Sequence, residues 1–308
     1  MISKLITGAF LAVLGSATLG LTHSHDLCEG IVPENDQYIP VFSLFNEVPT
    51  GTTEAEFNKV IDRAYEVYGP IIEEMGGTLK INRKWTDGTV NANASRQGST
   101  WLVNMYGGLA RHHTITADSF AMVLCHEIGH HLGGAPKYGW FNGWASNEGQ
   151  ADYFAGLKCM RKVFKNEDNI RYVEEKSAKI NPFAKVTCDS IYNTLEDQAL
   201  CIRTSMAGQE LANLFADLRK IDLPDFQTPD AGEVADTNDR HPAAQCRLDT
   251  YFAGALCTKD HRDDVSQSDA TVGTCNRRDG FDTGVRSRCW YNPDSTAAQT
   301  QNDLAFMN

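Results

Sequence analysis

The pentapeptide at residues 126–130, His-Glu-Ile-Gly-His, constrains this chain more than any other feature. It lies in an apolar stretch whose periodicity predicts a helix over residues 116–132, ended by Gly133. Residues four positions apart share one face of a helix, so the rings of His126 and His130 can bind the same metal ion. We therefore expect a domain built around a metal-binding helix.

A catalytic zinc site needs a third protein ligand and a position left open for water. Zinc peptidases with H-E-x-x-H-x-x-G-x-x-H use a further His, but Pro136 stands at that position and cannot bind metal. Others use a Glu from the next helix, in E-x-x-x-D. Glu148 and Asp152 fit that pattern, so we predict Glu148 as the zinc ligand and Asp152 as the hydrogen-bond partner of a ligating imidazole. The alternative is that both carboxylates only favour a helix N-terminus.

Three neighbours of the two histidines need separate interpretations. Glu127 follows the first His, and we expect it to act as the general base on water. His131 points about 100° away from His130 around the helix, so it is not a predicted ligand. Cys125 is a fourth ligand, a redox switch or a buried or bridged residue.

Three segments together resemble peptidase family M48, a family of gluzincin metallopeptidases. They read HEIGHHLGG at 126–134, NEGQADYFAG at 147–156 and HPAAQCRL at 241–248. The family pairs H-E-x-x-H with E-x-x-A-D and a later H-P-x-x-x-R. Many members are membrane-embedded, and the family pattern does not require the cysteine-rich C-terminal half of this chain, so the resemblance is to a soluble, exported branch.

The resemblance implies a role for each matching residue. It implies zinc bound by His126, His130 and Glu148, with Glu127 as the base. His241 would lie near the metal as an oxyanion-stabilising or gating group, and Arg247 would approach the site. The alternatives are a His at a helix start for His241 and a solvated or ion-paired side chain for Arg247.

The predicted fold is α+β: a mainly helical, zincin-like metallopeptidase domain with a small antiparallel sheet and a disulfide-tied C-terminal appendage. Thr53 and Glu56 form the pattern of a capping box at the start of a helix. The remaining predicted elements are strands at 79–85, 89–95 and 100–106, and helices at 146–164, 169–177, 188–219 and 241–257.

The N-terminus has the pattern of an export signal. Lys4 precedes an apolar run of small and aliphatic residues over 5–21. We predict a cleaved signal peptide at 1–21, a metallopeptidase domain at 22–258 and a cysteine-containing tail at 259–308. The alternative is a retained anchor; the cleaved form predicts a secreted or periplasmic protein without stable membrane insertion.

Nine cysteines in an exported chain predict a disulfide framework with one thiol left over. Closeness in sequence suggests pairing Cys188 with Cys201, Cys246 with Cys257 and Cys275 with Cys289. Two of Cys28, Cys125 and Cys159 then form a fourth disulfide, and the third is the thiol left over.

The motifs favour a hydrolase. A net charge of -12 argues against general affinity for nucleic acid. We expect a zinc-dependent metalloendopeptidase acting on protein or peptide; the alternatives are a peptidoglycan cross-link peptidase and a catalytically silent zinc-binding module. Residues 100–106 are either an edge strand that pairs with substrate or a core strand, and residues 138–144 either line a cleft or pack in the core. The oligomeric state stays open.

Overall fold

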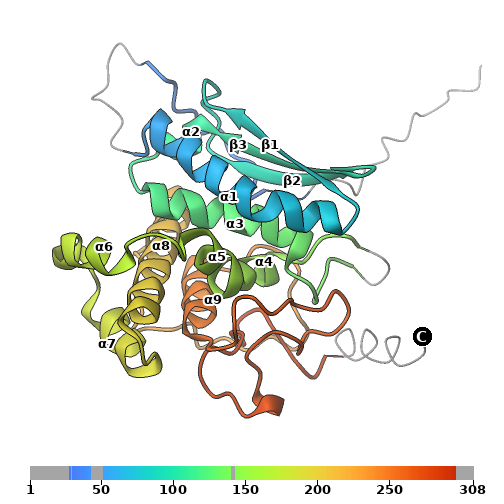
Figure 1. Cartoon of the computed structure of the whole chain (residues 1–308), viewed down its shortest axis with the longest axis vertical. Coiled ribbons are helices and arrows are strands. Elements are labelled where there is room, and N and C mark those ends of the chain that lie inside the picture. The colour runs from blue at the N-terminus through green and yellow to red at the C-terminus, as the bar shows by residue number, and fades with distance from the viewer. Residues whose placement is uncertain (1–27, 29, 43–50, 140–142, 296–308) are drawn as a thin grey trace, which may run out of the picture.

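The computed structural model describes residues 28, 30–42, 51–139 and 143–295, so the predicted signal peptide at 1–21 lies outside the described residues. The architecture is mainly helical with one three-stranded sheet, which confirms the α+β prediction (Figure 1). The α-helices are α1 Glu54–Glu74, α2 Gly107–Arg111, α3 Ala117–Leu132, α4 Glu148–Phe154, α5 Met160–Phe164, α6 Asn169–Glu175, α7 Pro182–Ile191, α8 Leu195–Arg219 and α9 Ala244–Leu256.

The sheet has the order β1-β3-β2, with β1 at Thr78–Lys84, β2 at Ala92–Gln97 and β3 at Thr100–Tyr106. β2 and β3 form an antiparallel hairpin, whereas β1 and β3 are parallel. The prediction of an antiparallel sheet is therefore wrong for β1. Thr89, in the segment after β1, pairs with Tyr38 and not with β1. The chain therefore leaves β1 and forms β2 at the opposite edge of the sheet. β3 is central and β1 and β2 are the outer strands, which contradicts the edge-strand interpretation of 100–106.

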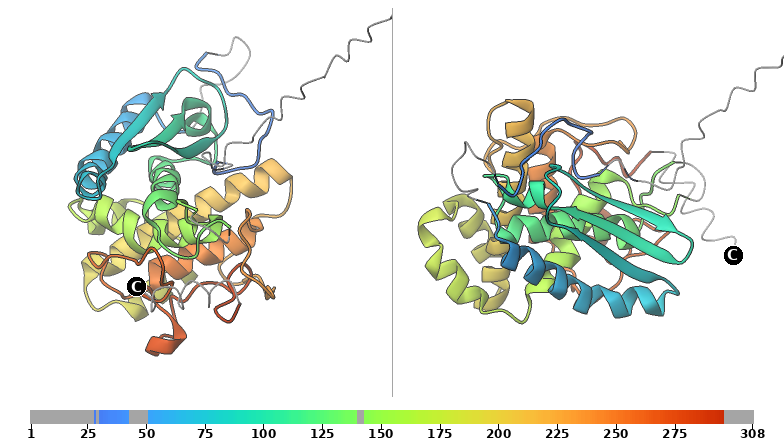
Figure 2. Two further views of the ribbon diagram at one scale, coloured as in Figure 1. Left: turned by 90° about the vertical axis from the view of Figure 1, so that its right-hand side faces the viewer. Right: turned by 90° about the horizontal axis from the view of Figure 1, so that it is seen from above.

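Helices α1 and α3 cover one face of this sheet (Figures 1 and 2). Thr53 caps α1 with the predicted capping box, and the helix turns Phe57, Ile61 and Tyr68 into the core. α3 lies between the sheet and a second layer of helices that includes α4 and α8. Because α3 is covered on both sides, almost all of its residues are buried.

Three helix boundaries in the second layer differ from the predicted ones. The helix predicted at 146–164 is continuous only in part, because a π-helical turn at Ala155–Cys159 separates α4 from α5. The helix predicted at 188–219 is two helices, since Thr194 caps a new start. The last helix begins at Ala244, so His241 lies in the preceding loop. None of the helices within the described residues is long and apolar enough to span a bilayer.

Four disulfides connect these elements, and two of the predicted pairs are wrong. Cys188–Cys201 is confirmed, and Cys125–Cys159 is bridged. The other two bonds are Cys246–Cys289 and Cys257–Cys275, in place of the predicted pairing of sequence neighbours. Residues that follow α9 fold back over it, so spatial distance no longer follows sequence distance. Cys28 is buried outside these four bonds.

The C-terminal region packs directly on the second layer. Trp290 is fully buried against Gly149 in α4, where a β-carbon would lie 2.1 Å from the indole ring. The Tyr153 hydroxyl of the same helix donates a 2.5 Å hydrogen bond to the Gly284 carbonyl. Only a residue without a side chain allows this approach at position 149, so α4 and the C-terminal region share one core. The division at residue 258 stays a prediction.

Candidate metal centre

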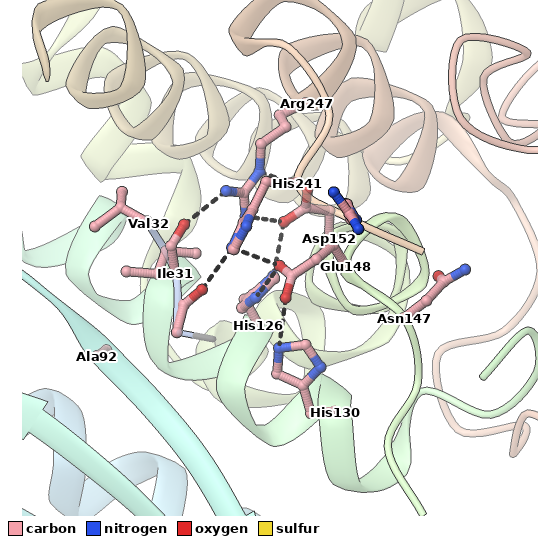
Figure 3. Close-up of polar contacts among 12 residues, drawn as sticks. Ile31, Val32, Ala92, His126, His130, Asn147, Glu148, Asp152, His241 and Arg247 are labelled. Atoms are coloured by element: carbon pink, nitrogen blue, oxygen red, sulfur yellow. Dashed lines mark hydrogen bonds and ion pairs between the residues drawn. The ribbon is translucent and has the colours of Figure 1, made fainter. Parts of the chain in front are cut away.

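The predicted metal ligands lie together in the interior of the molecule (Figure 3). His126 and His130 come from adjacent turns of α3, and Glu148 begins α4 after the N-cap Asn147. One ligand atom from each of the three side chains lies within 4.8 Å of the others. The Nε2 atoms of His126 and His130 are 3.3 and 3.7 Å from the Glu148 carboxylate oxygens. This group can hold a metal ion.

The polar atoms at its centre lack other partners. Among the described residues, nothing hydrogen-bonds Nε2 of His126, Nε2 of His130 or Oε2 of Glu148, and all three side chains are fully buried. Buried polar atoms without a partner are costly, and they are rare in folded proteins. A divalent cation would satisfy all three at once.

The opposite nitrogen of each imidazole is fixed by a hydrogen bond. Nδ1 of His126 lies 2.7 Å from Asp152 Oδ1, and Nδ1 of His130 lies 2.8 Å from the Ser146 carbonyl. A proton on Nδ1 leaves a lone pair on Nε2, which is the form that binds metal. The Asp152 contact is the one expected from its position one turn after Glu148.

Without a bound cation, the pKa values of the two imidazoles are shifted in opposite directions. Burial lowers the pKa of His130 to about 4 and keeps that ring neutral. Burial also opposes protonation of His126, but Asp152 and Glu148 raise its pKa to about 9. Metal binding releases such a proton, since cation and proton compete for the same nitrogen.

Glu127 is the most unusual carboxylate of the site. It is fully buried, and neither of its oxygens has a hydrogen-bond partner among the described residues. Burial raises its pKa to about 8. A buried carboxyl group whose pKa lies near neutrality can exchange a proton at physiological pH.

Arg247 and Tyr251 hold Asp152 from the other side. Arg247 donates two hydrogen bonds of 2.7 Å to this carboxylate, and the Tyr251 hydroxyl donates one of 2.5 Å. A third bond of 2.7 Å runs from Arg247 to the Ile31 carbonyl. Arg247 thus reaches the metal group through Asp152. Tyr251 was not predicted as a residue of the site. Its position one turn after Arg247 on α9, and so on the same face of the helix, is the signal that could have identified it.

His241 and Tyr138 complete the surroundings of Glu148. His241 Nε2 lies 3.2 Å from Glu148 Oε2 and 2.6 Å from the Gly30 carbonyl oxygen. The Tyr138 hydroxyl donates a 2.6 Å hydrogen bond to Glu148 Oε1. The sequence marked 138–144 only as an aromatic run, and residues 140–142 of it lie outside the described residues.

Two neighbours of the motif are accounted for by other contacts. His131 stacks between the rings of Trp101 and Trp144 and lies 3.2 Å from the Leu102 carbonyl, so it faces away from the metal group as expected. The disulfide of Cys125 with Cys159 confirms the bridged alternative and rules out a thiol ligand.

No known family model, curated protein or solved structure matches the chain. The geometry is therefore what distinguishes this group from the two other clusters of potential metal ligands. In the group of His112, His113 and Asp217, the Asp217 carboxylate already contacts His112 Nε2 at 3.2 Å, and His113 and Asp217 are exposed. A third group uses the sulfurs of Cys246 and Cys289, which are bonded to each other. Of these three groups among the described residues, only the one on α3 and α4 combines full burial with ligand atoms that lack a hydrogen-bond partner.

Proposed function

We propose that this protein is an exported zinc-dependent metalloendopeptidase, a soluble relative of peptidase family M48. The observation that carries the proposal is the buried group of His126, His130 and Glu148, with ligand atoms within 4.8 Å of one another. Two imidazoles and a carboxylate are the ligands of zinc sites that keep one position for water. Purely structural zinc sites are normally closed by four ligands, and the disulfide removes Cys125 as a fourth.

The residues of the chain divide the chemistry among them. When bound, zinc would acidify water and polarise a peptide carbonyl. Glu127 would accept a proton from the attacking water and later deliver it to the departing amine. Its two oxygens have no protein partner among the described residues and are therefore available for these transfers.

His241 is suited to stabilise the developing oxyanion. Its Nε2 lies 2.6 Å from a backbone carbonyl oxygen, the group that a peptide substrate presents. Burial lowers the pKa of His241, which favours a neutral ring whose Nε2 proton is donated. Arg247 would act as a positioning residue, because it orients Asp152, which in turn orients His126.

The substrate class and compartment follow from two other features. The backbone groups of the edge strand β2 could pair with an extended peptide. Edge strands recognise peptides in this way, by adding them to the sheet as a further strand. Four disulfides favour an oxidising compartment, so we propose a secreted or periplasmic protein.

The change Glu127→Gln tests the assignment. We expect the variant to bind one zinc ion as the wild type does, and to hydrolyse casein about 10²- to 10⁴-fold more slowly. The exposed Glu66, changed to Gln, is the control and should leave both properties unchanged.

Three outcomes would favour other functions or roles. Cleavage of purified peptidoglycan without casein hydrolysis would indicate a cross-link peptidase. Zinc binding without any hydrolysis by the wild type would indicate a silent zinc module. Loss of zinc from the Glu127→Gln variant would contradict the role of Glu127 as base.

A further inference from the structure

A short N-terminal segment pairs with the free edge of the sheet. Cys28 N–H donates to the Ala94 carbonyl and Ile31 N–H to the Ala92 carbonyl, each at 3.0 Å. The segment advances from 28 to 31 while its partners run from 94 to 92, so it is antiparallel to β2. It occupies the edge on which we expect an extended peptide substrate to bind.

Two consecutive carbonyls of this segment contact side chains of the candidate site. The Gly30 carbonyl oxygen lies 2.6 Å from His241 Nε2, and the Ile31 carbonyl accepts a 2.7 Å hydrogen bond from Arg247 (Figure 3). Both partners belong to the H-P-x-x-x-R element. A peptide main chain therefore already stands where a substrate carbonyl would meet the oxyanion-stabilising His241.

The side chains of the segment fit this place closely. Gly30 has a φ of +92°, and a β-carbon there would lie 2.5 Å from the Ala92 carbonyl oxygen. Ile31 is 0% exposed and Val32 2%, so both aliphatic side chains fill closed space. The chain then emerges at residues 33–36, which are exposed.

The site beside this segment is closed. His126, Glu127, His130 and Glu148 are each 0% exposed, so a substrate enters only if something covering them moves. The segment of Gly30, Ile31 and Val32 is attached through an exposed connection, which makes it displaceable without unfolding a helix or strand of the domain.

We propose that Gly30–Val32 is a built-in occupant of the peptide-binding cleft, bound as a substrate strand would be, and that the chain is inactive until this segment leaves. The inference rests on the proposed function. It also defines the preferred substrate: a peptide with glycine at the residue whose carbonyl meets His241, followed by a buried aliphatic residue.

The change Gly30→Ala tests the proposal by placing a methyl group against the Ala92 carbonyl. The control is Gly76→Ala, at a glycine with φ +78° and no atom within 4 Å of the added carbon. With zinc-loaded protein, we expect zinc removal by a chelator and casein hydrolysis both to rise about tenfold in Gly30→Ala relative to the control, because both rates follow the population of the open state.

A second experiment avoids substitution inside the cleft. A recognition sequence for a specific protease replaces the exposed residues 34–36, and cutting there separates the segment from the domain. We expect the fragment to dissociate, zinc removal and hydrolysis to accelerate, and a synthetic peptide with the sequence of residues 30–36 to reverse both effects. Circular dichroism checks that the cut protein stays folded.

The readouts separate the two proposals. Faster zinc removal and fragment release without hydrolysis would support the built-in occupant and contradict the peptidase assignment. A folded, cut protein that retains the fragment, or one that hydrolyses casein no faster than the uncut form, would overturn the inference. If cutting unfolds the domain, the segment is structural and the inference is wrong.

Discussion

Arg247 binds Asp152 through two parallel hydrogen bonds of 2.7 Å, and both side chains are buried. The same carboxylate lies 2.7 Å from His126 Nδ1. Asp152 therefore connects the buried guanidinium of Arg247 to the group of predicted metal ligands. Paired charges of this geometry depend on each other, since removing either one leaves the other unpaired in the interior.

The change Asp152→Asn should therefore have two effects. Zinc affinity should fall about 10- to 100-fold, because His126 loses the charged partner that orients it. The free energy of unfolding should fall by about 3–5 kcal/mol, because Arg247 stays buried without its carboxylate. Isothermal titration calorimetry and denaturant unfolding measure the two quantities.

Asp118 offers a matched control for this variant. It binds Arg203 through two hydrogen bonds of 2.7 and 2.8 Å, and it is also buried. Asp118→Asn should also lower stability, but by less, because Arg203 keeps its 2.8 Å ion pair with Glu167, and it should leave zinc affinity unchanged. Equal zinc affinities of the two variants would contradict the role given to Asp152.

Tyr138 should contribute to metal binding through Glu148. Its hydroxyl donates a 2.6 Å hydrogen bond to Glu148 Oε1, so Tyr138→Phe should lower zinc affinity about tenfold. The control is Tyr192→Phe, whose hydroxyl contacts the carbonyls of Ala255 and Cys257. That variant should lose some stability and keep the zinc affinity of the wild type. A competition assay with a chromophoric chelator would detect the difference.

The Cys125–Cys159 disulfide joins the metal helix to the π-helical turn after α4. It closes a loop with a sequence separation of 34, against 13 for Cys188–Cys201. Replacing both cysteines by alanine should cost about 4 kcal/mol for the longer loop and about 3 kcal/mol for the shorter one, by loop-closure entropy. Denaturant unfolding compares the two variants, and a larger loss for the shorter loop would contradict this order.

Glu210 should make stability depend on pH. Its carboxylate accepts a hydrogen bond from Thr116, and burial raises its pKa to about 7 from 4.5. The folded state then holds the proton more tightly than the unfolded state, so stability should fall as the pH rises from 4.5 to about 7 and change no further above it. In Glu210→Gln this part of the slope should vanish, as melting temperatures at pH 5 and pH 8 would show. An unchanged slope in the variant would contradict the assignment.

Local features of the sequence predicted the metal group well. The spacing of His126 and His130 sets their shared face, and Glu148 and Asp152 are one helical turn apart. These properties need only helical geometry, which is why they could be read from short segments. Asp152 also followed from its distance of one turn from Glu148.

Contacts between distant segments could not be read in this way. Cys246 in α9 and Cys257 at its end pair with residues that fold back from the C-terminal region. The position of β3 between β1 and β2 likewise depends on pairing between separate strands. The placement of Gly30 beside His241 joins residues 211 positions apart. No periodicity signals such a contact, because it depends on how the whole chain closes.

The packing of Trp290 on Gly149 also bears on the order of events during synthesis. A ribosome releases the chain from its N-terminus, and the indole that covers α4 emerges long after the helix itself. Until then, the helix that begins with Glu148 has one side exposed to water. The proposed metal centre therefore acquires its final surroundings only when nearly all of the polypeptide has been made.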